Sequence, residues 1–251
     1  MPPSAITQAA QLFAAAHTRR KLLSSPAAQW SPATADAAHA IQDATVAALG
    51  SAIGGWKANL VNGEVTRAPL LAASVYASPA RLPVTGDAPH GVEAEIAFRF
   101  DRDLPPREAA YSREEIIAAV TAVVVIEVLD TRFLPDAKVS ALDKMADLMS
   151  NHALVVGNTP ADWRAQDLSQ LTVELLVDGQ VLTRRTGSHP TLDPILPAIG
   201  LVNVLRSAGG VKAGQIITTG SCTGLHHAAA GQSVTARFES FGEASMVLTP
   251  P

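Results

Sequence analysis

The spacing of hydrophobic residues changes once along the chain, from helical in the first fifty residues to mostly strand-like afterwards. Residues 4–22 and 33–48 repeat apolar side chains every three or four positions, which predicts two helices separated by the segment SSPAAQWSP. The second helix, about Asp36 to Leu49, is expected to pack one face on the rest of the molecule. We therefore predict a helical N-terminal segment, residues 1–50, followed by a β-rich domain, residues 51–251.

Alternation of apolar and polar residues dominates the second part and predicts strands at 92–100, 152–157, 215–220 and 233–248. A short strand is expected at Trp56–Leu60, and a hairpin within 171–185 should turn at Asp178 and Gly179. Residues 61–90 carry four prolines and little periodicity, so loops and short strands are expected there.

Two further helices are predicted inside this β-rich part. Ser112, with Glu115 three residues later, forms a capping-box pattern for a helix through about Val123, after which VVVIEVL indicates a buried strand. Residues 130–150 form a charged stretch, and residues 192–210 form an amphipathic helix that glycines terminate. Helices first and then mostly strands indicate an α+β fold rather than alternating βα units.

Composition narrows the possible partners. The chain has 251 residues, 47% of them hydrophobic, which supplies a sizeable core. A net charge of −4 without a dense Lys/Arg run argues against nucleic-acid and membrane-surface binding. The single cysteine, Cys222, excludes an intramolecular disulfide and a cysteine-based zinc site. The apolar run at 116–129 is too short to span a membrane, and the N-terminus has the reverse of a signal peptide's order, so we predict a cytoplasmic protein.

Three acidic residues stand out against the apolar pattern. In GVEAEIAFRF, Glu93 and Glu95 share one strand face, with Ala94 and Ile96 on the other, and Glu127 lies inside VVVIEVL. Carboxylates that meet in an interior need a cation, and Mg²⁺ or Mn²⁺ suits oxygen ligands. The alternative is a solvent-exposed strand face for the first two and a salt bridge, for example to Arg132, for Glu127.

Two other segments could contribute to a site. Lys57 lies in the apolar stretch GGWKANL, where its ammonium would meet an anion or extend to solvent. The hydroxyl-rich turn in TTGSCTG, at 218–224, offers backbone amides and hydroxyls to a carboxylate, the alternative being a plain hairpin turn. Cys222 is expected to be a buried thiol rather than a nucleophile.

Together these motifs resemble the fumarylacetoacetate hydrolase superfamily, specifically its 2-keto-4-pentenoate hydratase and 4-oxalocrotonate decarboxylase branch. The resemblance runs from about residue 38 to 248, and its carriers, in order, are GGWKANL, VEAEIAFRFDRDLP, VVVIEVLDTRF, MADLMSNHALVVG, VELLVDGQVL, the stretch of Gly187 and Pro194, GGVKAGQIITTGSCTG and GQSVTARFESFGE. It implies a mixed-sheet roll or barrel-like body, the metal-binding catalytic domain, with N-terminal and inserted helices.

The resemblance also implies roles for individual residues. Glu93, Glu95 and Glu127 match the metal ligands, and a third ligand that is Glu rather than Asp favours the hydratase and decarboxylase branch. Lys57 matches a lysine that contacts the substrate and transfers protons, and Gly220 and Ser221 match a turn beside the substrate carboxylate. Asp147 matches an acidic position common in the branch, which we assign to substrate binding.

One departure from the family pattern concerns the segment after Lys57. Hydratases carry an acidic P-D-F-G-like segment there, whereas VNGEVTRAPLLAAS is short and lacks that Asp, and Glu64 is a speculative substitute. The sequence therefore predicts a Mg²⁺- or Mn²⁺-dependent hydratase of a small 2-oxo or 2-hydroxydienoic acid. The alternatives are a 4-oxalocrotonate-type decarboxylase, an acylpyruvate C–C hydrolase and a non-catalytic partner subunit. A homo-oligomer, or a complex with a sister subunit, is expected by the same resemblance.

Overall fold

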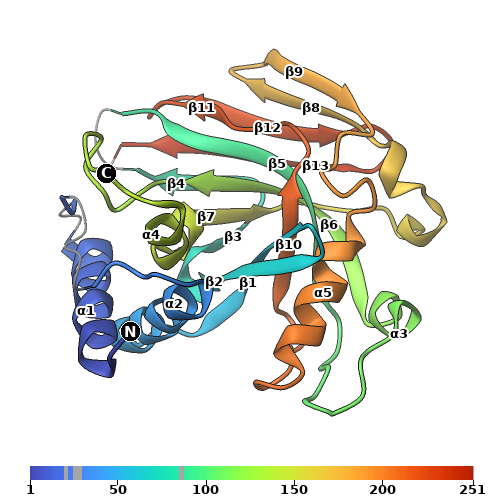
Figure 1. Cartoon of the computed structure of the whole chain (residues 1–251). Coiled ribbons are helices and arrows are strands. Elements are labelled where there is room, and N and C mark those ends of the chain that lie inside the picture. Colours follow the sequence, from blue (N-terminus) through green and yellow to red (C-terminus); the bar gives the residue numbers. More distant parts are fainter. Residues whose placement is uncertain (20–21, 25–29, 85–87, 251) are drawn as a thin grey trace.

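The structure is a computed structural model that describes residues 1–19, 22–24, 30–84 and 88–250. Two helices open the chain, α1 (Pro3–Arg19) and α2 (Ala35–Leu49), and they lie side by side at one end of the molecule in Figure 1. Residues 20–21, the end of the first predicted helix, lie outside the described residues. Thr34 caps α2 by accepting a hydrogen bond from the Ala37 N–H, and Gly50 ends it in the left-handed conformation.

The larger of two sheets has eight strands in the order β2-β1-β10-β5-β6-β7-β3, with β11 paired to β5 beside β10. Its strands are β1 (Ile53–Val61), β2 (Glu64–Leu71), β3 (Val75–Ala77), β5 (His90–Phe100), β6 (Val120–Leu129), β7 (Asn151–Val156), β10 (Ile216–Ser221) and β11 (His226–Ala228). Both parallel and antiparallel pairs occur, because β1 runs parallel to β10 while β5 is antiparallel to β6.

The second sheet has five strands in the order β4-β13-β12-β8-β9. They are β4 (Ala80–Pro83), β8 (Thr172–Val177), β9 (Gln180–Thr186), β12 (Ser233–Phe238) and β13 (Gly242–Thr249). This sheet lies against one face of the first, as Figure 1 shows, and the main hydrophobic core fills the space between them. Ala94, Ile96 and Phe98 of β5 point into that core, so the even-numbered face of this strand is structural.

The opposite face of the large sheet is concave and holds a separate apolar cluster. The members come from five different strands: Leu70, Ala97, Val123, Val125, Leu154 and Ile216. Strands β2 and β7 contact each other although several strands separate them in the sheet order, so the sheet curls on itself. The predicted mixed-sheet roll is therefore confirmed, and its inner face carries the odd-numbered residues of β5.

Short helices and one longer helix close the remaining surfaces. They are η1 (Ala72–Ser74), α3 (Arg113–Ile117), α4 (Ala141–Ala146), η2 (Leu148–Ser150), η3 (Trp163–Ala165), η4 (Leu168–Gln170) and α5 (Ile195–Leu205). Helix α5 buries Ala198, Leu201 and Val202 in the main core, with Trp56 and Ala58 of β1 in the same cluster. None of the helices within the described ranges has the length and apolarity needed to cross a membrane.

The N-terminal helices have a small core of their own that includes residues of the β-rich part. Phe13 of α1 packs edge-on against Trp30 and Phe133, and Ile41 of α2 joins the same cluster. In α2 the buried Gln42 amide donates to the backbone oxygens of Arg67 in β2 and Met145 in α4. A boundary between two domains near residue 50 stays a prediction.

Two local expectations were wrong. The helix expected to run to Val123 is only α3, because Val120 and its β-branched successors pair with β5 along the whole of β6. Residues 61–71, expected to form loops and short strands, contain the eight-residue strand β2, which forms a hairpin with β1. The turn is Asn62-Gly63, both at positive φ, and Asn-Gly is the strongest short hairpin signal in a sequence.

Candidate active site

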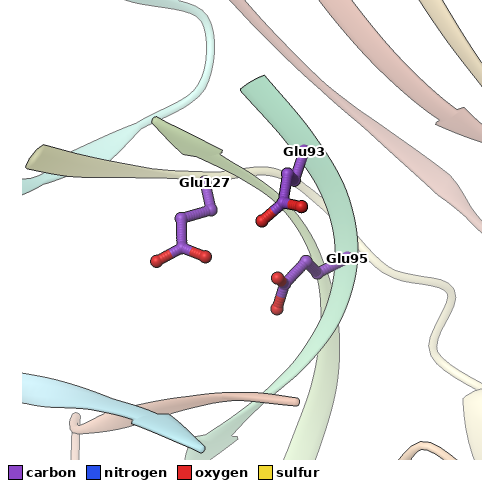
Figure 2. Close-up of side chains that lie close together, drawn as sticks. All are labelled: Glu93, Glu95 and Glu127. Carbon is purple, nitrogen blue, oxygen red and sulfur yellow. The ribbon is translucent and has the colours of Figure 1, made fainter. Parts of the chain in front are cut away.

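Three carboxylates converge on the inner face of the roll. Glu93 of β5 lies directly opposite Glu127 of β6, and Glu95 lies opposite Val125, one pair further along the same face. One ligand oxygen from each residue lies within 4.8 Å of the others. Figure 2 shows the three carboxyl groups turned toward the same space. Among the described residues, this is the group of acidic, His and Cys side chains placed to hold a metal ion.

Burial makes this cluster electrostatically unusual. Glu95 and Glu127 are fully buried, and Glu93 is partly buried. Loss of solvent, followed by the charges of Glu127 and Glu93, raises the pKa of Glu95 from 4.5 to about 8. Burial and the charge of Glu127 likewise raise the pKa of Glu93. Three negative charges in this space are therefore stable only with a cation or a bound proton among them.

Backbone amides support Glu95. Its Oε2 accepts hydrogen bonds from the N–H groups of Thr219, at 3.2 Å, and Gly220, at 3.0 Å. Both belong to β10, where Gly220 has a φ of 110°, a conformation that a residue with a Cβ rarely adopts. The other oxygen, Glu95 Oε1, is buried and accepts no hydrogen bond from any described residue.

Side chains support Glu127 instead. The Lys57 Nζ lies 2.8 Å from Glu127 Oε2, and the Asn151 amide donates to Oε1 at 3.0 Å. Burial by itself would lower the pKa of Lys57, but the Glu127 and Glu95 carboxylates outweigh it and raise that pKa, so the lysine is a cation. Lys57 is 8% exposed, which rules out the solvent-extended alternative.

These donors fit a divalent metal ion. A buried carboxylate oxygen without a hydrogen bond and two neighbouring carboxylates form an all-oxygen set of the kind that Mg²⁺ and Mn²⁺ prefer. The Lys57 ammonium compensates one of the three charges, and the remainder is what a bound cation would neutralise.

No protein-family model matches the chain, but several curated proteins are similar to it. A 2-keto-4-pentenoate hydratase of Paraburkholderia phymatum is 29% identical over 181 residues, which cover 72% of this chain and 68% of that protein. A 2-hydroxyhexa-2,4-dienoate hydratase of Comamonas testosteroni is 31% identical over 159 residues, covering 62% and 59%. A 4-oxalocrotonate decarboxylase of Pseudomonas putida is 29% identical over 133 residues, covering 52% and 50%. The chain is thus similar to 2-keto-4-pentenoate hydratases, a 2-hydroxyhexa-2,4-dienoate hydratase and a 4-oxalocrotonate decarboxylase.

The fold of the chain matches solved structures over nearly its whole length. A 4-oxalocrotonate decarboxylase of Pseudomonas putida G7, complexed with magnesium and adipate, has a TM-score of 0.81 at 21% identity and covers 99% of this chain and 98% of its own. The same enzyme complexed with calcium and acetate has a TM-score of 0.83 at 20% identity, with the same two coverages. These likenesses establish the fold.

The two residues expected beside a substrate carboxylate lie at the end of β10. The Gly220 N–H is directed to Glu95, so this amide serves a carboxylate of the protein. The Ser221 hydroxyl lies beside Glu93, where it offsets part of the increase that burial causes in the pKa of Glu93. Both residues adjoin the acidic cluster. Glu64, the speculative acid, is exposed at the turn end of the hairpin, several residue pairs away from Lys57.

Asp147 is not part of the acidic cluster. It is fully buried, and its two oxygens accept hydrogen bonds from the Arg132 side chain, the Arg132 N–H and the Thr131 hydroxyl. Arg132 therefore pairs with Asp147, not with Glu127 as the alternative reading of the sequence had it. Substrate binding by Asp147 stays a prediction, and its carboxylate oxygens are already in use.

Sequence reasoning missed Asn151, and it placed His189 in a segment that flanks the site without giving it a partner. Asn151 is the only polar contact of Glu127 besides Lys57 among the described residues, and its signal is a buried amide opening an apolar strand. His189 Nδ1 accepts the Thr191 N–H, so Nε2 carries the proton and donates to the Thr219 hydroxyl at 3.3 Å. That hydroxyl in turn donates to Ile96 O, which fixes the turn whose amides hold Glu95.

Two titratable groups near the site do not change their protonation state near pH 7. Burial lowers the pKa of His189 to about 4, so its imidazole is neutral near pH 7. Cys222 is buried as expected, and burial raises the pKa of its thiol to about 12, which keeps it protonated and unreactive.

Proposed function

We propose that the chain is a divalent-metal-dependent hydratase of a small 2-hydroxydienoic acid such as 2-hydroxypenta-2,4-dienoate. The observation that carries the proposal is a buried cluster of three carboxylates with a cationic lysine inserted against one of them. Relatives that are named hydratases support the reaction, and the family's metal-containing structural neighbours support the need for an ion.

In this proposal Glu93, Glu95 and Glu127 hold Mg²⁺ or Mn²⁺. When bound, the ion would polarise the carboxylate and 2-oxo oxygens of the substrate and favour its enolate form. The chain's own part is to keep the three carboxylates turned to one point and away from bulk water. The apolar cluster at Ala97, Val125 and Leu154 lies on the same inner face next to the carboxylates and excludes water from that side.

Lys57 would move the proton in the first half of the reaction. Its Nζ–H donates a proton to the terminal carbon of the dienol, and the neutral amine that results takes up the proton that the 2-hydroxyl loses, which converts the dienol into a 2-oxo-3-enoate. Water then adds across the remaining carbon–carbon double bond. Ser221, and Gly220 through the left-handed backbone of its turn, would orient the substrate carboxylate.

A second candidate is decarboxylation of a 4-oxalocrotonate-type substrate. A relative named 4-oxalocrotonate decarboxylase favours it, and the same enolate stabilisation would assist loss of CO₂. The two reactions share the ion, the lysine and the enolate, so the residues of this site do not separate them.

The test is an assay of metal-stripped protein with 2-hydroxypenta-2,4-dienoate, 4-oxalocrotonate and an acylpyruvate, each with and without Mg²⁺ or Mn²⁺. We expect turnover of the dienoate only with metal, and a drop of about a hundredfold to a thousandfold in Glu95→Gln. The matched control is Glu174→Gln in β8 of the second sheet, which should keep full turnover. Metal-independent turnover, or faster turnover of another substrate, would contradict the proposal.

A further inference from the structure

A strained segment forms one wall of the site. Leu148, Met149 and Ser150, between α4 and β7, are three successive residues other than glycine with φ values of 48°, 51° and 57°. Such left-handed backbone is unfavourable for residues that carry a Cβ, and it persists only where surrounding contacts impose it.

This segment delivers two contacts to the acidic cluster. The Met149 carbonyl oxygen lies 3.4 Å from Lys57 Nζ and accepts a hydrogen bond from it. Directly after the segment, the Asn151 side chain donates to Glu127 Oε1. The segment thus orients both members of the Lys57–Glu127 ion pair, each from a different atom.

One buried arginine binds the residues on both sides of the segment. Arg132 Nε donates to Asp147 Oδ1 at 2.5 Å and its Nη2 donates to the Asp147 carbonyl, before the segment. Its Nη1 donates to the Asn151 carbonyl at 2.7 Å, after the segment. Arg132 is 6% exposed and Asp147 is fully buried, so water does not compete for these bonds.

The arginine is itself tied to the strand that carries Glu127. Arg132 follows the end of β6 by three residues, and the Asp130 N–H between them donates to the Ser150 carbonyl at 2.9 Å. The Arg132 N–H also donates to Asp147 Oδ2 at 3.0 Å. Strand β6 therefore places the carboxylate, and the loop that follows it places the segment that orients this carboxylate.

We propose that Arg132 and Asp147 are positioning residues, which hold Leu148–Ser150 in its left-handed form so that Met149 O and Asn151 fix Lys57 and Glu127. The inference rests on the proposed roles of Lys57 and Glu127, and it gives Asp147 a role other than substrate binding. Neither Arg132 nor Asp147 touches the substrate in this account. A planar guanidinium supplies donors in several fixed directions at once, which a lysine in its place does not.

The experiment compares Arg132→Lys and Asp147→Asn with the full-length wild-type protein. Readouts are kcat and KM with the dienoate, Mn²⁺ affinity by calorimetry, and amide hydrogen exchange of residues 148–151. We expect kcat and Mn²⁺ affinity each to fall by about tenfold or more, with little change in KM and faster exchange in the segment. Asp147→Asn keeps the shape of the side chain, and Arg132→Lys keeps the charge should Asp147→Asn fail to fold.

The matched control is Phe241→Leu, a core substitution between β12 and β13 that should lower Tm without changing kcat or Mn²⁺ affinity. Folded Arg132 and Asp147 variants that lose only Tm, as this control does, would overturn the inference. Failure of the proposed function has a different signature, because the wild-type protein itself would then neither bind Mn²⁺ nor turn over the dienoate.

Discussion

Glu95 and Glu127 are equally buried and lie on adjacent strands, yet the chain supports them in opposite ways. Glu95 is held by two backbone amides of β10, which carry no net charge and do not titrate. Glu127 is held by the side chains of Lys57 and Asn151, one of them a cation. One carboxylate thus has a fixed cradle, and the other has a partner that can give up a proton and move.

The difference teaches where chemistry can occur in the cluster. Backbone amides of a paired strand stay in place during a reaction, so the Glu95 side suits permanent metal ligation. In the proposed function, an ion held by Glu127 would weaken the Lys57–Glu127 ion pair and leave the ammonium group available to a substrate. In the proposed function, the Glu95 side would therefore hold the ion and the Glu127 side would carry the proton transfer.

The largest effect is expected from removing the cation on the Glu127 side. Lys57→Met should lower kcat by about a hundredfold to ten-thousandfold, because the proton donor is lost, while Mn²⁺ still binds at least as tightly. Steady-state kinetics and calorimetric Mn²⁺ titration measure the two quantities. Lys212→Met, at an exposed lysine paired with Asp103, should change neither. If Lys57→Met instead loses Mn²⁺ affinity, the lysine serves to position the carboxylates that bind the ion and not to donate a proton.

The Glu95 side should dominate the pH dependence of stability. Its folded pKa is raised to about 8, so the folded protein keeps a proton that the unfolded chain releases, and the free energy of unfolding of metal-free protein should fall between about pH 6.5 and 8. His17 and His189 have pKa values lowered by burial to about 3 and about 4, so their destabilising effect is confined to more acidic solutions.

Thermal denaturation in EDTA, repeated with excess Mg²⁺, measures this dependence. Mg²⁺ displaces the proton, so its stabilising effect should grow with pH, and calorimetry in two buffers of different ionisation enthalpy should detect proton release on binding. Glu95→Gln should abolish the decline in stability across this window. A Tm of the metal-free protein that stays level or rises from pH 6.5 to 8 contradicts the assignment.

The smallest effect is expected on Mn²⁺ affinity when the support of Glu95 and the support of Glu127 are each weakened separately. Thr219→Val removes a hydroxyl that links His189 to Ile96 O but leaves the amides on Glu95, so Mn²⁺ affinity should fall only severalfold. Asn151→Leu removes the donor to Glu127 outright and should weaken Mn²⁺ binding by tenfold or more. If the two variants lose equal Mn²⁺ affinity in the same titration, the backbone amides on Glu95 are no more robust a support than the side chains on Glu127.

The alternation of apolar and polar residues along the strands allowed much of the site to be predicted from the sequence. Because strand side chains change face at every residue, Glu93 and Glu95 had to share a face opposite Ile96, and the structure places them so. An acidic residue within an apolar run also marked Glu127. The partner of that residue was not readable, since Lys57 and Arg132 were both available and only the fold brings Lys57 to Glu127 and Arg132 to Asp147.

Other errors have equally local causes. The capping box at Ser112 is real, but a cap fixes where a helix starts and not how far it runs, and strand pairing of β6 stops it after five residues. The left-handed backbone at Leu148–Ser150 has no signal in the sequence, because none of the three residues is glycine. We attribute that conformation to the contacts of Arg132 with Asp147 and Asn151, which lie 15 and 19 residues further along the chain.

The two faces of strand β5 also have a consequence for which substitutions the protein would tolerate. Its even positions, such as Ala94, Ile96 and Phe98, belong to the core between the sheets, and its odd positions face the acidic cluster. Adjacent codons therefore come under two different kinds of selection, one acting on the amount of folded protein and the next on the rate at which each molecule works. Among related sequences, substitutions at even and at odd positions of this strand should therefore vary independently of each other.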